Sequence, residues 1–273
     1  MSTDEEWEKW GRQDPYYGVI TDERYRAGRL TAEARAEFFA SGEAHVEGVI
    51  AKCRRLFEPS FAPKRALDFG CGVGRVLVPL ARISELVVGA DVSPAMLEAA
   101  ERHCTASGVS NVYLVVSDDA LTQVQGQFDL IHSTITLQHI EVERGLVILT
   151  HLLHRLAPGG IAAIQLTYAK AYYPGSYGQP PAPGLAAALQ PMAGTLTRLL
   201  RRGARGADID ETGAAATPVA DPEMLMNPYP LSEVAYLLQT AGIRSFHAEF
   251  TDHGGELGVF LYFQKPKPDR SRC

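Results

Sequence analysis

The 273-residue chain lacks the cysteine patterns of disulfide-stabilised and zinc-binding proteins. Its four cysteines, Cys53, Cys71, Cys104 and Cys273, are scattered, and no two of them form a C-x-x-C pair. Such scattered cysteines are typical of a reducing compartment and argue against a zinc site or a disulfide framework. We therefore expect a cytoplasmic protein without a bound metal.

Long hydrophobic runs and basic runs are also scarce. The apolar runs are far shorter than a membrane span, and the acidic, polar start of the chain is unlike a signal peptide. The net charge is −6, and no basic run stands out apart from Arg198, Arg201, Arg202 and Arg205. These features argue against a nucleic-acid substrate and a membrane protein. A composition with 46% hydrophobic and 21% charged residues is typical of a globular protein with a sizeable core.

The most informative stretch is Ala66–Val76, which reads Ala-Leu-Asp-Phe-Gly-Cys-Gly-Val-Gly-Arg-Val. An apolar run ends at Asp68, glycines follow at every second position, and a helix-like apolar run comes next. This order predicts a strand, a tight turn and a helix N-terminus. Glycine permits positive φ and lets a ligand lie against bare backbone. The helix start adds unpaired N–H groups and the positive end of a dipole.

The glycine spacing discriminates between nucleotide-binding loops. A dinucleotide fingerprint needs its third glycine where Arg75 stands, and the Gly-Lys-Ser/Thr of a P-loop is absent. The observed acid-x-Gly-x-Gly-x-Gly resembles the first motif of the class I S-adenosylmethionine (SAM)-dependent methyltransferases. The resemblance implies SAM as cofactor, S-adenosylhomocysteine (SAH) as product, and a glycine turn that passes the methionine portion. The alternative is a glycine turn in another βαβ unit, such as that of a nicotinamide oxidoreductase.

Two later elements strengthen this resemblance. The predicted strand Glu85–Asp91 ends in an acid, and a carboxylate at this tip can accept both ribose hydroxyls of a nucleoside. Further on, the predicted helix Glu143–Leu156 runs into Ala157-Pro158-Gly159-Gly160 and then the strand Ile161–Leu166. The order of a helix, Leu-x-Pro-Gly-Gly and a strand is frequent in the same family.

The predicted elements give an α/β fold: a doubly wound, seven-stranded, mostly parallel sheet of the Rossmann-like methyltransferase type. Residues 244–250 and 258–264 predict a terminal antiparallel hairpin that turns at Asp252–Gly255. We divide the chain into an N-terminal helical lid or extension, 1–60, and a methyltransferase domain, 61–273, whose residues 167–230 form an insertion.

The sequence of the N-terminal extension and of the insertion leaves alternatives open. Asp14–Gly18 predicts a turn, and Thr31–Phe57 predicts a helix in two pieces hinged at Ser41-Gly42. The aromatic residues before Thr31 either fold over the cofactor pocket or pack on the outside of the domain. In the insertion we expect a helix over residues 185–202 and weak structure over 203–221. The insertion is a candidate substrate cover, or else a surface excursion.

The resemblance assigns cofactor-binding roles along the strand ends. Asp118 is favoured over Asp119 as the adenine-reading acid, although either could be a solvated turn residue. Met96 could pack on the adenine or be an ordinary core methionine, and Cys71 reads as an apolar filler rather than a reactive thiol. The candidate cofactor-binding residues are Tyr17, Asp68, Gly70, Cys71, Gly72, Gly74, Asp91, Val92, Met96, Ser117, Asp118, Asp119, Ser133 and Thr134.

The reaction follows from the expected cofactor. An oxygen acceptor needs a base. His139, just beyond the fourth predicted strand (128–134), is the first candidate, and His253 is the second. His139 could instead cap a helix or fill the core. Candidate substrate-binding residues are Tyr16, Gln138, Tyr168, Tyr172, Asn227 and Tyr229.

The expected function is methyl transfer to a small molecule, with O-methylation favoured. The Asn/Asp-Pro-Pro-Tyr sequence of amino-methylating enzymes does not follow the fourth strand, and the similar Asn227-Pro-Tyr-Pro230 reads as a turn before the last helix. The alternatives are an N- or C-methyltransferase, a protein or RNA methyltransferase, and a SAM-binding accessory protein without activity. The acceptor and the oligomeric state stay open.

Overall fold

The computed structural model describes residues 2–180 and 220–267 of the chain. The chain divides into two compact units, of which one comprises residues 1–169 and 222–273 and the other residues 170–221. The helix predicted over 185–202, and all but the last two residues of the run 203–221, lie outside the described residues. The substrate-cover role of the insertion therefore stays a prediction.

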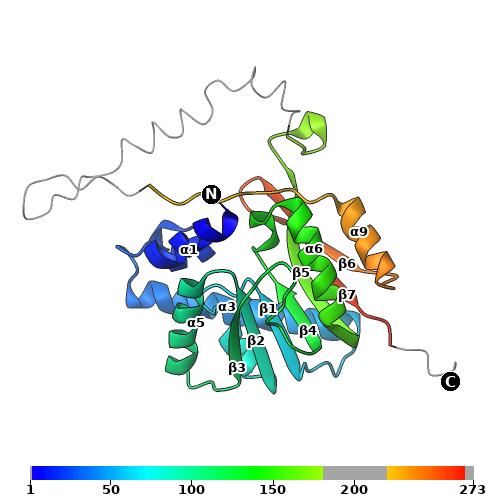
Figure 1. The fold of residues 1–273 in the computed structure, drawn as a ribbon, viewed down its shortest axis with the longest axis horizontal. Helices are drawn as coiled ribbons and strands as arrows, with labels where there is room; N and C mark the ends of the chain where they lie inside the picture. Colours follow the sequence, from blue (N-terminus) through cyan, green and yellow to red (C-terminus); the bar gives the residue numbers. More distant parts are fainter. Residues whose placement is uncertain (1, 181–219, 268–273) are drawn as a thin grey trace, which may run out of the picture. The chain divides into compact units, whose positions relative to one another are not determined.

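In the described part of the chain, seven strands form one sheet in the order β3-β2-β1-β4-β5-β7-β6 (Figure 1). The first five strands pair in parallel, whereas β6 and β7 form an antiparallel hairpin. The doubly wound sheet and its terminal hairpin are therefore confirmed. The strands are β1 (Arg65–Phe69), β2 (Leu86–Asp91), β3 (Val112–Val116), β4 (Phe128–Ser133), β5 (Leu156–Lys170), β6 (His247–Asp252) and β7 (Glu256–Gln264).

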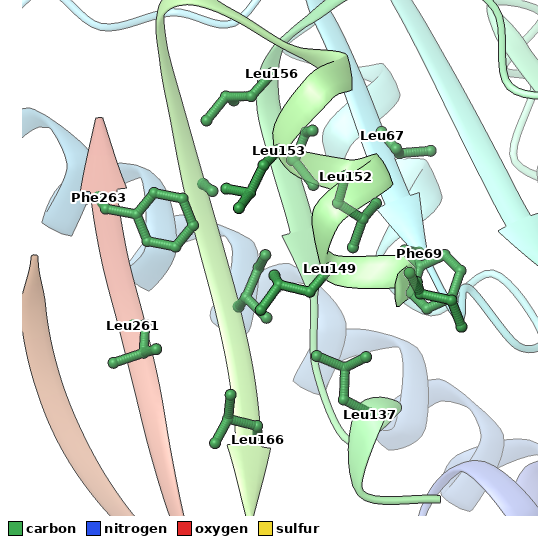
Figure 2. Packing of buried hydrophobic residues seen from close by; sticks show 14 of the residues in the cluster. Leu67, Phe69, Leu137, Leu149, Leu152, Leu153, Leu156, Leu166, Leu261 and Phe263 are labelled. Carbon is green, nitrogen blue, oxygen red and sulfur yellow. The ribbon is translucent and has the colours of Figure 1, made fainter. Parts of the chain in front are cut away.

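The central strands β1, β2 and β4 are almost entirely buried because helices cover both faces of the sheet. Successive side chains of a strand point to opposite faces, so Ala66 joins one buried cluster and Leu67 the other. Figure 2 shows the second cluster, in which leucines of α6 lie against side chains of β1, β5 and β7. The helices of one face are α3 (Ala32–Leu56), α4 (Leu77–Ala81) and α5 (Pro94–Ala106); those of the other are α6 (Val142–Arg155) and α9 (Leu231–Thr240).

The chain begins with short helices that precede the sheet: α1 (Thr3–Gln13), α2 (Pro15–Val19) and η1 (Glu23–Tyr25). Ser2 starts α1 with a capping box in which its hydroxyl accepts from the Glu5 amide. The turn predicted over Asp14–Gly18 is wrong except at Asp14. Pro15 occupies the first position of α2, where its fixed φ favours a helix and its missing N–H costs nothing.

The hinge predicted at Ser41-Gly42 is also wrong, because α3 is one continuous helix of 25 residues. Gly42 does not bend the helix but allows the backbone of Arg75 to approach α3 closely. A Cβ built on Gly42 would lie 2.1 Å from the carbonyl oxygen of Arg75, directly after the glycine turn. The glycine therefore lets α3 pack against the loop that follows β1.

Other element boundaries follow the predictions closely. The strand predicted from Ile161 starts earlier, at Leu156, and its pairing with β4 shifts register between Phe128 and Leu130. Gly159 has φ +81° within this irregular start, a conformation that favours glycine. No helix among the described residues is both long enough and apolar enough to cross a membrane.

Two glycines of α3 allow a matched test of this packing. Gly48→Ala, which would meet nothing within 4 Å, should stabilise the protein by about 1 kcal/mol through helix propensity. Gly42→Ala should instead destabilise it by about 1–3 kcal/mol, since the added methyl overlaps the Arg75 carbonyl. Urea unfolding of the two variants measures both effects. Equal stabilisation by both substitutions would contradict the close approach.

Candidate functional site

The glycine turn after β1 requires glycine at each of its three positions. Gly70, Gly72 and Gly74 have φ values of +73°, +51° and +83°. Space is restricted as well: a Cβ on Gly70 would lie 2.2 Å from the Thr136 side chain, and one on Gly72 would lie 2.7 Å from Val19. The amides of Gly70 and Cys71 donate to the Ala90 carbonyl, which folds the turn onto β2.

A cavity opens beside this turn, at the carboxyl ends of β1, β2, β3 and β4. Its volume is about 820 Å³ when the open mouth is included. Strand order reverses between β1 and β4, the place where open parallel sheets bind ligands. Nine of the fourteen predicted cofactor-binding residues line the cavity: Gly70, Gly72, Asp91, Val92, Met96, Ser117, Asp118, Asp119 and Thr134.

Asp91, at the tip of β2, connects the turn to the next helix. One carboxylate oxygen accepts from the Gly72 amide at 2.8 Å, and the other accepts from the Ser93 amide at 2.9 Å. The side chain is buried, and burial raises its pKa from 3.8 to about 6 despite these two hydrogen bonds. Each oxygen keeps a lone pair, so the carboxylate can still accept hydrogen bonds from a ligand in the cavity.

The two acids beyond β3 differ in their surroundings. The Asp118 carboxylate accepts from both the amide and the hydroxyl of Thr122, and the hydroxyl bond holds its pKa below the usual value. Asp119 pairs with Arg144 at 2.7 Å, and Arg144 also pairs with Asp4 of α1 at 3.1 Å. The ion pairs thus connect α1, α6 and the end of β3 at the cavity.

His139 lies in the short helix η2 (Leu137–His139) after β4 and is only 3% exposed. It lines the cavity, and its ring lies 4.9 Å from the ring of Trp7. Nδ1 is 2.7 Å from the carbonyl oxygen of Leu225. Because a carbonyl only accepts, Nδ1 carries the proton and Nε2 keeps a lone pair. Burial lowers the pKa of His139 to about 4, so the ring is neutral near pH 7.

The segment that returns from the insertion sets this tautomer. The Asn227 amide donates to the Gln138 carbonyl at 2.7 Å, and its side chain donates to the Ile140 carbonyl. Tyr229 is 1% exposed, and its hydroxyl also donates to Ile140. These contacts fix the segment along η2, which brings the Leu225 carbonyl to His139.

The other predicted cofactor positions do not line the cavity. Asp68 is buried and bonds to His132 Nδ1 at 2.7 Å, and Gly74 packs against Ala100. Cys71 is buried, and burial raises the pKa of its thiol well above 9.0, as suits an apolar filler. Tyr17 lies under the guanidinium of Arg26, and Ser133 is fully buried at the end of β4.

The second base candidate and the predicted substrate-binding residues lie elsewhere. His253 is in the turn between β6 and β7, where its amide donates to Glu256, and it does not line the cavity. Tyr172 belongs to the other compact unit. The remaining predicted substrate-binding residues also fall outside the cavity lining: Tyr16, Gln138, Tyr168, Asn227 and Tyr229.

Asp4, Trp7 and Arg144 also line the cavity. None of them is among the predicted site residues, although Trp7 is one of the aromatic residues before Thr31 that could fold over the cofactor pocket. Trp7 and Asp4 carry no local signal, because their position depends on how α1 docks. Arg144 carries a weak signal in the sequence. It lies in the first turn of α6, where the helix dipole disfavours a cation, so its position indicates a role other than helix stability.

Comparison with known proteins identifies the fold around this cavity. A family model described as a methyltransferase domain matches residues 66–160, which include the glycine turn, Asp91 and His139. Residues 66–160 are therefore similar to a methyltransferase domain. The chain is also 36% identical over 104 residues to the ubiquinone biosynthesis O-methyltransferase of Ruegeria pomeroyi. The match covers 38% of this chain and 41% of that relative.

Solved structures of methyltransferases resemble the fold of this chain over nearly its whole length. The magnesium protoporphyrin IX methyltransferase of Synechocystis PCC 6803 with bound SAM aligns over 97% of this chain and 98% of its own, with a TM-score of 0.58 and 14% identity. The N-methyltransferase NodS of Bradyrhizobium japonicum WM9, in complex with SAH, gives a TM-score of 0.53 over 98% and 100% of the two chains, also at 14% identity. At this identity the likeness is one of fold.

Removing the Arg144 side chain should loosen the attachment of α1. In Arg144→Met, which breaks the pairs with Asp4 and Asp119, amide exchange in residues 3–13 should become about two- to fivefold faster, as expected for partly exposed ion pairs. Hydrogen–deuterium exchange with mass spectrometry measures this rate. Arg82→Met is the control, because it breaks an exposed pair with Glu43 outside α1. Equal exchange of α1 in both variants would contradict the role of Arg144.

Proposed function

We propose that the chain binds SAM in this cavity and transfers the methyl group to a small molecule, with oxygen favoured as the acceptor. The observation that carries the proposal is the junction of a bare glycine turn with a buried carboxylate at the tip of the next strand. The domain match over residues 66–160 and the partial sequence similarity of the chain to ubiquinone biosynthesis O-methyltransferases support it. The net charge of −6 favours a small acceptor over a nucleic acid.

The chemistry of the cavity residues fits this cofactor. Gly70 and Gly72 leave backbone uncovered for the methionine portion, since a Cβ on either would clash with the opposite wall. Asp91 would accept from the ribose hydroxyls, and Asp118 with the apolar Met96 would hold the adenine. When bound, SAM supplies an electrophilic methyl group on a positively charged sulfur. The protein has to orient the acceptor, exclude water and remove a proton.

His139 is the proposed base. Its Nδ1–H donates to the Leu225 carbonyl, so Nε2 is unprotonated and accepts a long hydrogen bond of 3.4 Å from the side-chain amide of Gln138. An acceptor hydroxyl would replace Gln138 as the donor to Nε2. The low pKa means that the neutral form is present at every pH above about 4, although the ring is then a weak base. A weak base favours an acidic hydroxyl, such as that of a phenol, over an aliphatic alcohol.

We also propose that α1 acts as a lid for the cofactor. Thr3, Asp4 and Trp7 line the cavity from one side, while Glu8 accepts from the Ser93 hydroxyl and the Ala95 amide at the start of α5. These contacts attach α1 to two sides of the site, so the helix has to move for the cofactor to exchange.

Methyl transfer to matched probes tests the proposed reaction. With methyl-labelled SAM, we expect label on 4-methylcatechol but not on 4-methylbenzylamine, because the site holds a neutral base for an acidic hydroxyl. Label on the amine alone would contradict oxygen as the acceptor atom. SAH binding without transfer to any hydroxyl, carboxyl or amine probe would favour an accessory protein.

Substitution of the two candidate histidines tests the base. His139→Ala should lower kcat at saturating SAM by about 10²–10⁴-fold, the usual contribution of a general base, with unchanged SAH affinity. His253→Ala is the control and should keep full turnover, since His253 lies outside the cavity lining. For the wild type, kcat should stay flat down to about pH 5, because the pKa of His139 is about 4. Equal kcat values in the two variants would refute the assignment.

Asp91 makes cofactor affinity depend on pH. Its pKa is raised to about 6, so it gains a proton below that pH and loses acceptor capacity for the ribose hydroxyls. The affinity for SAH should therefore fall as pH decreases below 6, by at most about tenfold per unit. Calorimetric titrations between pH 5 and 7.5 measure this slope. Asp91→Asn should bind weakly with no such slope, and a flat wild-type affinity would contradict the assignment.

A further inference from the structure

Arg75 is a buried cation at the wall of the cavity. It directly follows the glycine turn, is 8% exposed and lines the cavity. Its backbone carbonyl and Cγ lie against Gly42 of α3, and Nη1 is 3.4 Å from the Ser41 hydroxyl. The side chain is therefore enclosed between the turn and α3 rather than extended into solvent.

The guanidinium lacks an anionic partner within residues 2–180 and 220–267. No carboxylate oxygen of these residues lies within 4.0 Å of it, and Nε is buried without any hydrogen-bond partner. Asp68, the nearest contributor of negative charge, is already bonded to His132. Burial lowers the pKa of Arg75, as expected for a cation removed from water without compensation.

The other arginine that lines the cavity provides the contrast. Arg144 pairs with both Asp4 and Asp119, and these carboxylates raise its pKa. A buried guanidinium that is charged but unpaired is costly, and such groups in proteins are usually paired with an anion. Arg75 has neither an ion pair nor a hydrogen bond at Nε among the described residues. We therefore expect an anionic ligand to bind in the cavity beside the glycine turn.

We propose that Arg75 binds the carboxylate of the amino-acid portion of the cofactor. The proposal rests on the proposed function, because SAM is the ligand that brings this group to the glycine turn. The carboxylate is the one anionic group of SAM, and a guanidinium matches its planar geometry with two parallel hydrogen bonds. Arg75 thereby distinguishes SAM and SAH from nucleosides that lack the carboxylate.

Binding of SAM and decarboxylated SAM tests the proposal, because the two ligands differ in the carboxylate alone. Calorimetry on the wild type should give about ten- to hundredfold tighter binding of SAM, the usual worth of charge-assisted hydrogen bonds. In Arg75→Gln this preference should fall to about one, because only SAM loses affinity. Arg75→Lys should restore part of the preference, since it keeps the charge without the planar fork.

The control variant is Arg82→Met, which removes one positive charge on the surface and should keep the wild-type preference. If Arg75→Gln keeps the full preference for SAM over decarboxylated SAM, the proposal is overturned. It is also overturned if the variant raises only the KM for a carboxylate-bearing methyl acceptor, because Arg75 would then bind the acceptor instead of the cofactor. A wild type that binds both ligands equally would overturn it without any variant. A wild type that binds neither ligand would overturn the proposed function itself, so the two failures are distinguishable.

Discussion

The hydrogen bond from the Gly72 amide to the Asp91 carboxylate is the constraint on which the site depends. It fixes a turn in which three residues have positive φ against the tip of the neighbouring strand. The same carboxylate receives the Ser93 amide and so positions the start of α5. Asp91 thereby positions both the glycine turn and the start of α5 beside the cavity. Its raised pKa reflects the free-energy cost of keeping a carboxylate charge out of water.

Charged side chains outside the sheet hold α1 beside the cavity. Arg144 ties α1 to the end of β3, and Glu8 of α1 reaches the N-terminus of α5, where a carboxylate meets unpaired amides and the positive dipole end. On the other side, Asn227 holds the returning segment along η2. The neutral tautomer of His139 is thus set by residues more than eighty positions away in the chain.

The sheet and the core of the cavity could be predicted because their signals are local. A positive φ strongly favours glycine, and a strand that ends in an acid is visible in a few residues, as at Gly72 and Asp91. Gly42 shows the limit of such local signals: the glycine suggests a hinge, whereas the structure uses it to admit the Arg75 carbonyl. Trp7, Asp4 and the Leu225 carbonyl reach the site only through tertiary packing, which no spacing in the sequence encodes. Tyr229 is among the predicted substrate-binding residues, whereas in the structure its hydroxyl donates to the backbone carbonyl of Ile140.

The most direct test of the account is a calorimetric titration of the purified chain with SAH near pH 7.5, with NAD as the comparison ligand. If the glycine turn and Asp91 form a binding site for an adenosyl amino acid, SAH should bind at one site per chain, whereas titration with NAD should show no saturable binding. No binding of SAH, or tighter binding of NAD, would contradict the assignment of the cavity and every role derived from it.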